Sequence, residues 1–282
     1  MNFLENIIQR CHQRHEKPLR QRKTKVTPAL HKGLPYNFTV YCAWRYPIRL
    51  YELEQANISF MPIGRAPQHD HGPSDFGEER FLNPQRSSDW DNWLWHAAWG
   101  IQVYTGTPSE CNGTQWHDID FKYEAICAAP DAVLTCVEAL LNAVANPLLT
   151  LSKSGGLRFS CRIQNYLHPN TNEAKQYIYK HTPTSENPDH RDLHLEILGD
   201  KGYSRWDARY EILIGDLLNP PIIAKEVLFA PIDTLRAALH QPAPLRETEL
   251  EPSAQTTSIM PMFFGSHNLN LAKEAFLKRG FS

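Results

Sequence analysis

The chain has 282 residues, of which 41% are hydrophobic and 11% aromatic, so it can build a substantial core and is not a disordered protein. Its formal net charge of -2 neither indicates nor excludes a nucleic-acid partner. The length fits one large domain or two closely joined ones.

The six cysteines are scattered without a C-x-x-C pair, which argues against a zinc knuckle and a disulfide framework. No apolar run is long enough for a membrane span, and the N-terminus lacks the apolar core of a signal peptide. We therefore expect buried thiols, no membrane partner and a cytoplasmic location.

The first 35 residues carry a local excess of positive charge. Eight Lys and Arg residues oppose two Glu residues there, which indicates either a solvated helix and tail or an arm that attracts phosphate. The basic residues are Arg10, Arg14, Lys17, Arg20, Arg22, Lys23, Lys25 and Lys32. The pattern predicts a helix over 2–16, followed by a proline-punctuated segment.

Strands and helices alternate along the rest of the chain. Strands are predicted over 37–44, 58–63, 100–106, 116–125, 192–203 and 209–215, with a β-hairpin over 149–163. Helices are predicted over 51–56 and 131–146, and residues 225–240 combine strand-like residues with a helix. We expect Asp131 to be the N-cap of the second helix and Asn146-Pro147 to end it. A surface loop is expected over 64–86.

This order of elements indicates an α+β protein, or an α/β protein with a mainly antiparallel sheet. We expect four parts: a basic N-terminal helical and strand extension (1–58), a core (59–240), a linker (241–258) and a C-terminal helical segment (259–282).

Two aspartates share one face of the strand predicted over 116–125. Because side chains alternate along a strand, Asp118 and Asp120 point one way while Ile119 and Phe121 point into the core. Two neighbouring carboxylates repel each other unless a cation lies between them, and Mg²⁺ or Mn²⁺ prefers oxygen ligands. The pair is a candidate metal site, although such pairs are also common on surfaces.

A third acid lies in the middle of the strand predicted over 192–203. Its apolar neighbours share one face, which leaves Glu196 on the other, where an unpaired carboxylate is costly to bury. Glu196 is therefore a third metal ligand or an orienting base, or else the partner of Arg205 or Arg209 in a salt bridge.

Gly155-Gly156 separates two strand-like runs and suits a two-residue primed turn, in which both positions have a positive φ. Arg158 follows and alternates with apolar residues, so one strand face is cationic. Lys153, Ser154 and the backbone N–H groups of the turn lie beside it, a combination suited to phosphate. The alternative is a hairpin with one solvated face.

Four segments resemble, in order and spacing, motifs of the archaeo-eukaryotic primase superfamily, most closely its primase-polymerase branch. They are a glycine-ended strand (WG at 99–100 and YTG at 104–106), a D-x-D strand (DID), an S-G-G turn (SGGLR) and a strand acid before a glycine-containing stretch (LEILGDKGY). FMPIGRAP at 60–67 resembles an early proline-containing segment of the family. The resemblance covers about residues 60–235.

The resemblance implies an N-terminal α/β unit packed on an RRM-like antiparallel sheet, with helical N- and C-terminal extensions and the active site between the two layers. It implies that Asp118, Asp120 and Glu196 hold two Mg²⁺ or Mn²⁺ ions. The implied nucleotide-binding residues are Lys153, Ser154, Gly155, Gly156, Arg158, Tyr203, Arg205 and Arg209. Arg158 replaces the family's usual histidine; it can clamp a triphosphate bidentately but cannot titrate near neutral pH.

The expected function is a DNA-directed nucleotidyltransferase, a primase-polymerase in which a 3′-hydroxyl attacks the α-phosphate of an NTP or dNTP. Its partners would be the nucleotide and a single-stranded or primed DNA template, with a helicase or other domain if the chain was cut from a longer protein. The biological context, CRISPR-associated systems included, stays open.

The alternative is a non-catalytic nucleic-acid or nucleotide-binding module of a replication-initiation or defence system. A metal-dependent relaxase around His69-Asp70-His71 is disfavoured because these residues lie in the predicted loop. A restriction-type nuclease is disfavoured because Leu198 stands where such an enzyme needs lysine.

Overall fold

The computed structural model describes residues 3–19, 39–64, 98–164, 175–180, 194–198 and 202–240. His69-Asp70-His71, with most of the predicted loop, and both segments predicted after residue 240 lie outside these residues. Within the described part, helices combine with mainly antiparallel sheets, which confirms the predicted α+β class.

The elements follow the predicted alternation in part, since strands β2, β5, β9 and β13 were not predicted. The helices are α1 (Phe3–Glu16), α2 (Leu50–Gln55), α6 (Tyr123–Ala128), α7 (Pro130–Asn142) and α8 (Lys225–His240). The strands are β1 (Thr39–Ala43), β2 (Tyr46–Arg49), β3 (Phe60–Gly64), β4 (Ala98–Tyr104), β5 (Gly106–Cys111), β6 (Thr114–Phe121), β7 (Leu148–Leu151), β8 (Leu157–Gln164), β9 (Lys175–Lys180), β10 (His194–Leu198), β11 (Tyr203–Asp207), β12 (Glu211–Ile214) and β13 (Ile222–Ala224). Among these helices, none has the length and apolar character that crossing a bilayer requires.

The largest sheet has the strand order β12-β7-β8-β6-β10-β9, and β5 and β13 join it at β6 and β8. β8 is antiparallel to both β6 and β7, so α6 and α7, which connect β6 to β7, form a crossover with β8 between the connected strands. β10 pairs with the other side of β6, again antiparallel. The DID strand therefore lies between the strand after the glycine turn and the strand that carries Glu196.

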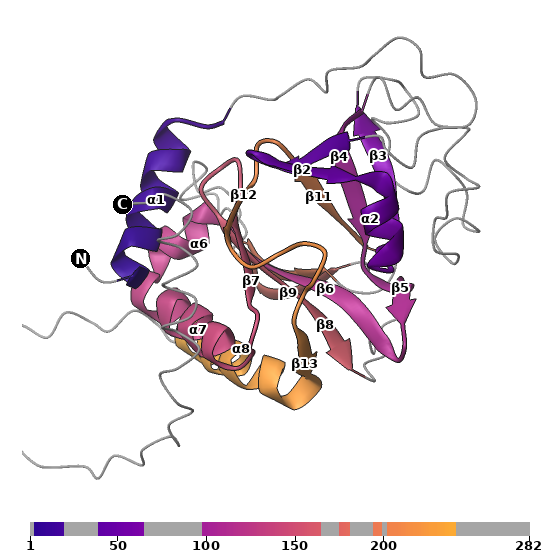
Figure 1. Ribbon diagram of the computed structural model, residues 1–282. Coiled ribbons are helices and arrows are strands. Elements are labelled where there is room, and N and C mark those ends of the chain that lie inside the picture. The colour runs from indigo at the N-terminus through magenta and orange to yellow at the C-terminus, as the bar shows by residue number, and fades with distance from the viewer. Residues whose placement is uncertain are drawn as a thin grey trace, which may run out of the picture.

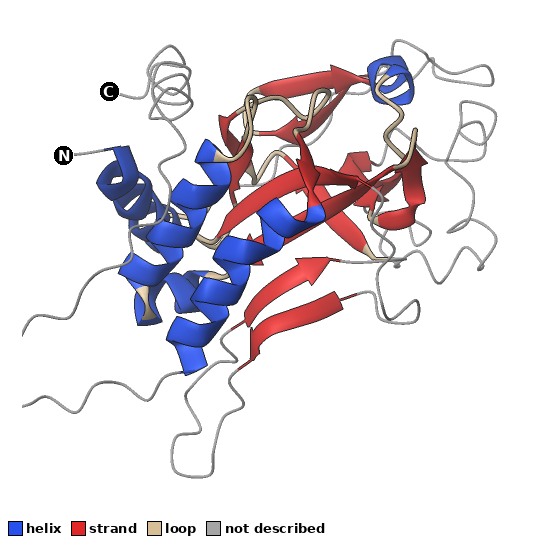
Figure 2. Cartoon of the chain, turned by 90° about the horizontal axis from the view of Figure 1, so that it is seen from below, coloured by secondary structure: helices blue, strands red, loops and turns tan. Residues whose placement is uncertain are grey.

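Helices α1, α6, α7 and α8 cover one face of this sheet (Figures 1 and 2). Ile119 and Phe121 of β6 and Phe159 of β8 point to this face and are fully buried. They pack with the apolar stripe of α7, which recurs at helical spacing, and with Ile7 and Cys11 of α1. Burial of one such side chain contributes about 1.5–3 kcal/mol, so this cluster is a main source of stability.

A second, three-stranded sheet with the order β11-β4-β3 packs over the other face. One hydrophobic cluster joins the two sheets, with Trp116 from β6 and Trp206 from β11 in edge-to-face contact at 6.3 Å between ring centroids. The DID side chains lie on this second face. They are thus enclosed between two sheets rather than open to solvent.

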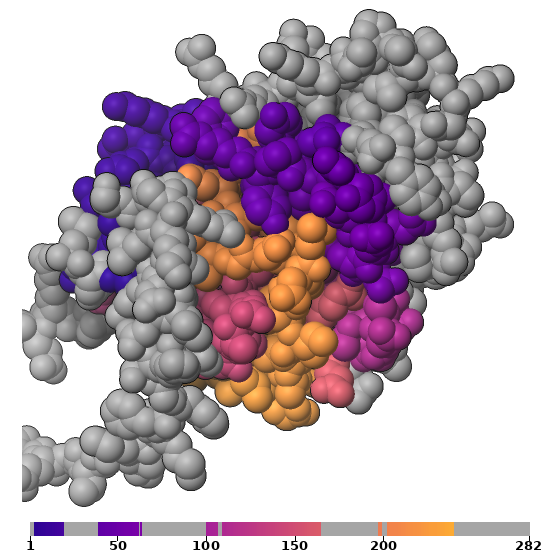
Figure 3. Space-filling view, viewed as in Figure 1, coloured from indigo at the N-terminus to yellow at the C-terminus, as the bar shows by residue number. Residues whose placement is uncertain are grey.

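Residues 39–58, predicted to be part of an N-terminal extension, pack into the same cluster. Val40 and Leu53 are fully buried there, and the Trp44 backbone N–H donates to the Tyr210 carbonyl oxygen at 2.6 Å. Figure 3 shows this segment, in violet, bordering the orange residues after position 202.

Six local predictions were wrong. The helix predicted over 131–146 ends at Asn142, before Asn146-Pro147. The segment predicted as one strand over 192–203 contributes to two strands in different sheets, β10 and β11. The strand over 116–125 ends at Phe121, and a short helix begins at Tyr123. The N-cap of α7 is Ala129, because Pro130 takes the first helical position that suits its fixed φ. The hairpin is closed by five residues, 152–156, and only Gly155 has a positive φ, at 90°. Residues 225–240 form one helix without a strand.

Candidate functional site

Backbone register brings three predicted segments into one row across the central sheet. Glu196 on β10 lies opposite Asp120 on β6, and Asp120 lies opposite Arg158 on β8. Thr150 on β7 continues the row beyond Arg158. Opposite residues of antiparallel strands are the closest cross-strand neighbours, so the acids and the arginine converge although they are far apart in the sequence. The backbone of Glu196 is described; its side chain lies outside the described part.

Two cationic side chains neutralise the carboxylate of Asp120. Arg158 Nε donates to Oδ1 at 2.7 Å and Nη2 lies 3.5 Å from Oδ2, while Lys122 Nζ donates to Oδ2 at 2.9 Å. Burial alone would raise the pKa of Asp120, which is 7% exposed, but the charges of Arg158 and Lys122 outweigh burial and hold this pKa well below its usual range. Asp120 is therefore ionised and paired at any ordinary pH.

Arg158 is a structural cation in this arrangement. It is 5% exposed, its third nitrogen donates to the Arg205 carbonyl oxygen at 2.7 Å, and its guanidinium lies 4.8 Å from the centroid of the Tyr210 ring. Burial lowers its pKa, but Asp120 more than compensates and raises it. A triphosphate would have to displace Asp120 or the carbonyl to bind this arginine.

Asp118 is more deeply enclosed, with a side chain that is 0% exposed. Trp116 Nε1 donates to Oδ1 at 3.0 Å, whereas Oδ2 has no hydrogen bond of normal geometry. Burial raises the pKa of Asp118, and the nearby charge of Arg158 and the hydroxyls of Ser160 and Ser204 only partly oppose this. Burial thus shifts the protonation balance of Asp118 toward the neutral form compared with an exposed aspartate.

Replacing Asp118 with asparagine should make the protein more stable than the parent as pH rises. Because folding raises the pKa of Asp118, this carboxyl group stabilises the folded protein at pH values below its unfolded-state pKa of about 4. That contribution is lost as the pH rises through its folded-state pKa. Asparagine can keep the Trp116 contact without ionising. Urea unfolding of both proteins from pH 4 to pH 8 measures this; a difference that does not change with pH would contradict it.

The glycine hairpin is covered by α1 on one side. Gly155 lies so close to α1 that an added Cβ would be 2.5 Å from the Cys11 carbonyl oxygen. His15 Nδ1 donates to the Ser154 carbonyl oxygen at 3.0 Å, and the His15 ring stacks on Tyr123 at 3.8 Å. The Gly156 N–H donates to Ser152 Oγ, so this amide is not available to a phosphate, whereas the side chain of Ser154 stays exposed.

Basic residues from three segments lie on the other side of the hairpin. Burial lowers the pKa of Lys153, and the positive charges of Arg209 and Arg205 also lower it while Asp207 opposes them, so both arginines act on Lys153 electrostatically. Arg205 and Lys153 are exposed, and Arg209 is held by Asp207 through Nη2 at 2.6 Å. Together with Lys122, we call Lys153, Arg205 and Arg209 the cationic patch.

Two divalent ions need several carboxylate oxygens that are free to coordinate them. Both oxygens of Asp120 are engaged, and Asp118 offers one buried oxygen. Among the described side chains, which do not include that of Glu196, no three His, Cys, Asp or Glu form a group that could hold a metal ion. To coordinate a metal ion, Asp120 would have to release Arg158 or Lys122.

Several functional neighbours were missed or assigned differently by sequence reasoning. Trp116 and Lys122 continue the i, i+2 alternation of Asp118 and Asp120, so the strand pattern itself could have placed them on the same face. Ser204 and Trp206 reach the site from a separate sheet, which no local pattern indicates. Comparisons with protein-family models, curated proteins and solved structures give no match for this chain.

Proposed function

We propose that the chain is a nucleotide- and nucleic-acid-binding module with a core like that of the archaeo-eukaryotic primase superfamily. In this proposal the cationic patch holds the phosphate groups of the ligand. The observation that carries it is the pairing of Asp120 with Arg158 and Lys122, since this pairing occupies the acid that a polymerase would need for its metal ions.

The local charge favours an anionic ligand. Five cationic side chains gather around the carboxylates of Asp118, Asp120 and Asp207. The cations are Lys122, Lys153, Arg158, Arg205 and Arg209. Even if Asp118, Asp120, Asp207 and Glu196 are all counted as ionised, five positive charges face four negative ones. Such a surface attracts phosphate and disfavours a divalent cation.

The fold and one aromatic side chain support the same proposal. The order β7-β8-β6-β10, with a helical crossover between β6 and β7, agrees with an RRM-like antiparallel sheet. Tyr203, at the start of β11 and two residues before Arg205, is 38% exposed. It offers a ring on which a base can stack, and base stacking beside a basic surface is a common way to bind single strands.

Nucleotidyl transfer is a second candidate function. The register that places Glu196 opposite Asp120 favours it, because three acids then lie on neighbouring strands beside the hairpin. For this chemistry Arg158 and Lys122 would have to leave Asp120. A ligand with several phosphates could draw away Lys122, which is half-buried, more readily than Arg158.

Binding of labelled single-stranded DNA, followed by fluorescence anisotropy at several salt concentrations, tests the proposal. We expect Lys153→Gln/Arg205→Gln to weaken binding about tenfold or more and to reduce the slope of log K against log salt by about 1.4, that is 0.7 for each lost phosphate contact. Arg236→Gln, which removes a comparably exposed charge on α8, is the control and should change neither quantity. Equal affinity of the patch variant and the parent would refute the patch as the binding surface.

Primer extension separates the two candidate functions. The parent and Asp118→Asn are incubated with a primed template, dNTPs or NTPs, and Mg²⁺ or Mn²⁺. The binding module predicts no incorporation by either protein. Incorporation by the parent that Asp118→Asn abolishes would instead establish nucleotidyl transfer.

A further inference from the structure

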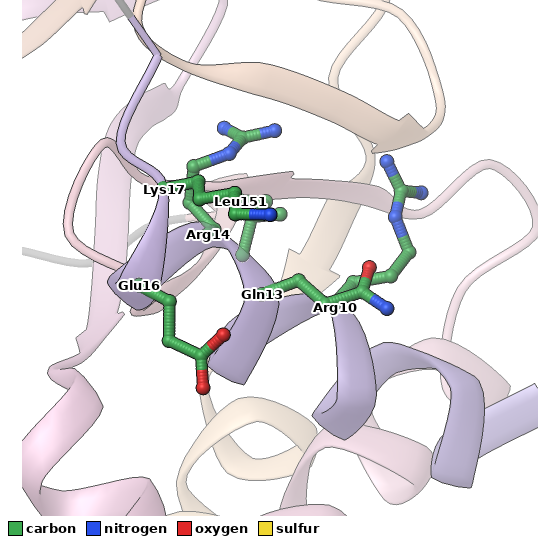
Figure 4. A pocket seen from close by; sticks show the side chains of 6 residues that line it. All are labelled: Arg10, Gln13, Arg14, Glu16, Lys17 and Leu151. Atoms are coloured by element: carbon green, nitrogen blue, oxygen red, sulfur yellow. The ribbon is translucent and has the colours of Figure 1, made fainter.

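A pocket of about 400 Å³ lies where α1 crosses the end of β7. Figure 4 shows the side chains that line it, and most of them come from α1. They are Arg10, Gln13, Arg14, Glu16, Lys17 and Leu151. In the same view the Glu16 carboxylate points away from the two guanidinium groups, so the side chains around the hollow are mainly cationic.

The two arginines of this pocket share one carboxylate. Arg10 Nη2 lies 2.8 Å from Glu211 Oε1, and Arg14 Nη2 pairs with Glu211 Oε2. Glu211 stands opposite Leu151 in the sheet, on the face that the helices cover. The Glu211 carboxylate is thus divided between two guanidinium groups. Burial lowers the pKa of Arg14, and the attraction of Glu211 opposes this only in part.

Arg14 also has an unused donor. Its side chain is 8% exposed, and its Nη1 is buried without a hydrogen-bond partner. A buried donor without a partner is costly, and this cost is greater for a charged group. The unpaired donor of Arg14, in a pocket that Arg10 and Lys17 also line, therefore calls for an anion that can accept hydrogen bonds.

We propose that this pocket binds a phosphate monoester or free phosphate. Guanidinium groups pair well with phosphate oxygens because their donors match the spacing of those oxygens, and Lys17 adds a mobile positive charge at the exposed end of α1. The hollow can hold one phosphate with part of its substituent. The pocket lies on the helix-covered side of the hairpin, so it is distinct from the cationic patch.

Isothermal titration with inorganic phosphate, and with a short single strand that carries or lacks a 5′-phosphate, tests this site. We expect Arg14→Gln to weaken phosphate binding by about 10- to 100-fold, the range for loss of a charged hydrogen bond. Glu211→Gln, which removes the competing carboxylate, should tighten binding severalfold. Arg236→Gln, on α8 outside the pocket, is the control that should bind phosphate as the parent does.

If Arg14→Gln does not fold, Lys17→Gln replaces it, since Lys17 is exposed and its loss should weaken binding about threefold. A preference for the 5′-phosphorylated strand identifies a strand end as the ligand, whereas equal binding of both strands together with binding of inorganic phosphate identifies a small phosphate compound. Both results support the site. No binding of phosphate by the parent, or equal binding by the parent and the Arg14 or Lys17 variant, would overturn it.

Discussion

Replacement of Asp120 with asparagine is expected to lower the free energy of unfolding by about 3–5 kcal/mol, the usual cost of breaking a buried ion pair from one side. The reason is that Arg158 would remain buried between two sheets without its counter-charge, and Lys122 would lose its partner as well. Urea unfolding at pH 7 measures the loss, and circular dichroism shows whether the variant is folded.

A double-mutant cycle with Arg158→Gln provides the control. If the pair acts as a unit, the double variant should lose clearly less stability than the two single losses added together. Because folding lowers the pKa of Asp120, its contribution to the free energy of unfolding is fully present at pH values above its unfolded-state pKa of about 4. That contribution is lost as the pH falls below this pKa. A loss below 1 kcal/mol at pH 7 would show that Asp120 is not a structural acid and would favour the catalytic candidate.

The second large effect is expected at the glycine hairpin. Gly155→Ala should destabilise the protein by about 2–4 kcal/mol, because a left-handed backbone costs an L-residue about 1–2 kcal/mol and forced overpacking costs about 1–3 kcal/mol. The residue has a φ of 90°, and its new Cβ would meet the Cys11 carbonyl oxygen at 2.5 Å. We expect α1 to move away from the hairpin, which limited proteolysis of the N-terminal segment would reveal.

Gly113→Ala separates the two causes of this loss. Gly113 has a φ of 74° in the exposed β5–β6 turn, so it shares the backbone strain of Gly155 without the contact to α1. The loss in Gly155→Ala beyond that in Gly113→Ala measures the packing of α1 on the hairpin. Equal losses, with α1 equally resistant to protease, would mean that the helix does not depend on this contact.

The sequence predicted the elements well because their signals are local. The two-residue alternation of β6 and the 3.6-residue stripe of α7 each appear within one segment, and each element formed where it was predicted. The errors lie at boundaries and in four short strands, β2, β5, β9 and β13, that were not predicted. At Tyr123 the strand pattern continued into residues that suit a helix equally well, and at the hairpin two adjacent glycines suggested a shorter turn than the five residues that the backbone uses.

The candidate site was predictable as a set of positions but not as a set of contacts. The motif order correctly indicated that the strands of Asp118, Arg158 and Glu196 would be neighbours. It did not reveal that Arg158 would pair with Asp120. A guanidinium group on a polar strand face can bind a phosphate ligand or a buried carboxylate through the same charged hydrogen bonds, so the sequence does not distinguish the two partners. The β11-β4-β3 sheet encloses Arg158 beside Asp120 and so favours the ion pair. How the strands of this sheet pair depends on contacts between residues far apart in the chain, which a single sequence does not reveal.

The enclosure of Asp118 between two sheets has a kinetic consequence. Nothing from solvent can reach its carboxylate unless the β11-β4-β3 sheet separates from β6 and breaks the contact between Trp116 and Trp206. Chemical labelling of this acid should therefore proceed no faster than transient opening of that interface, and its rate should rise steeply on heating, as rates of partial unfolding do.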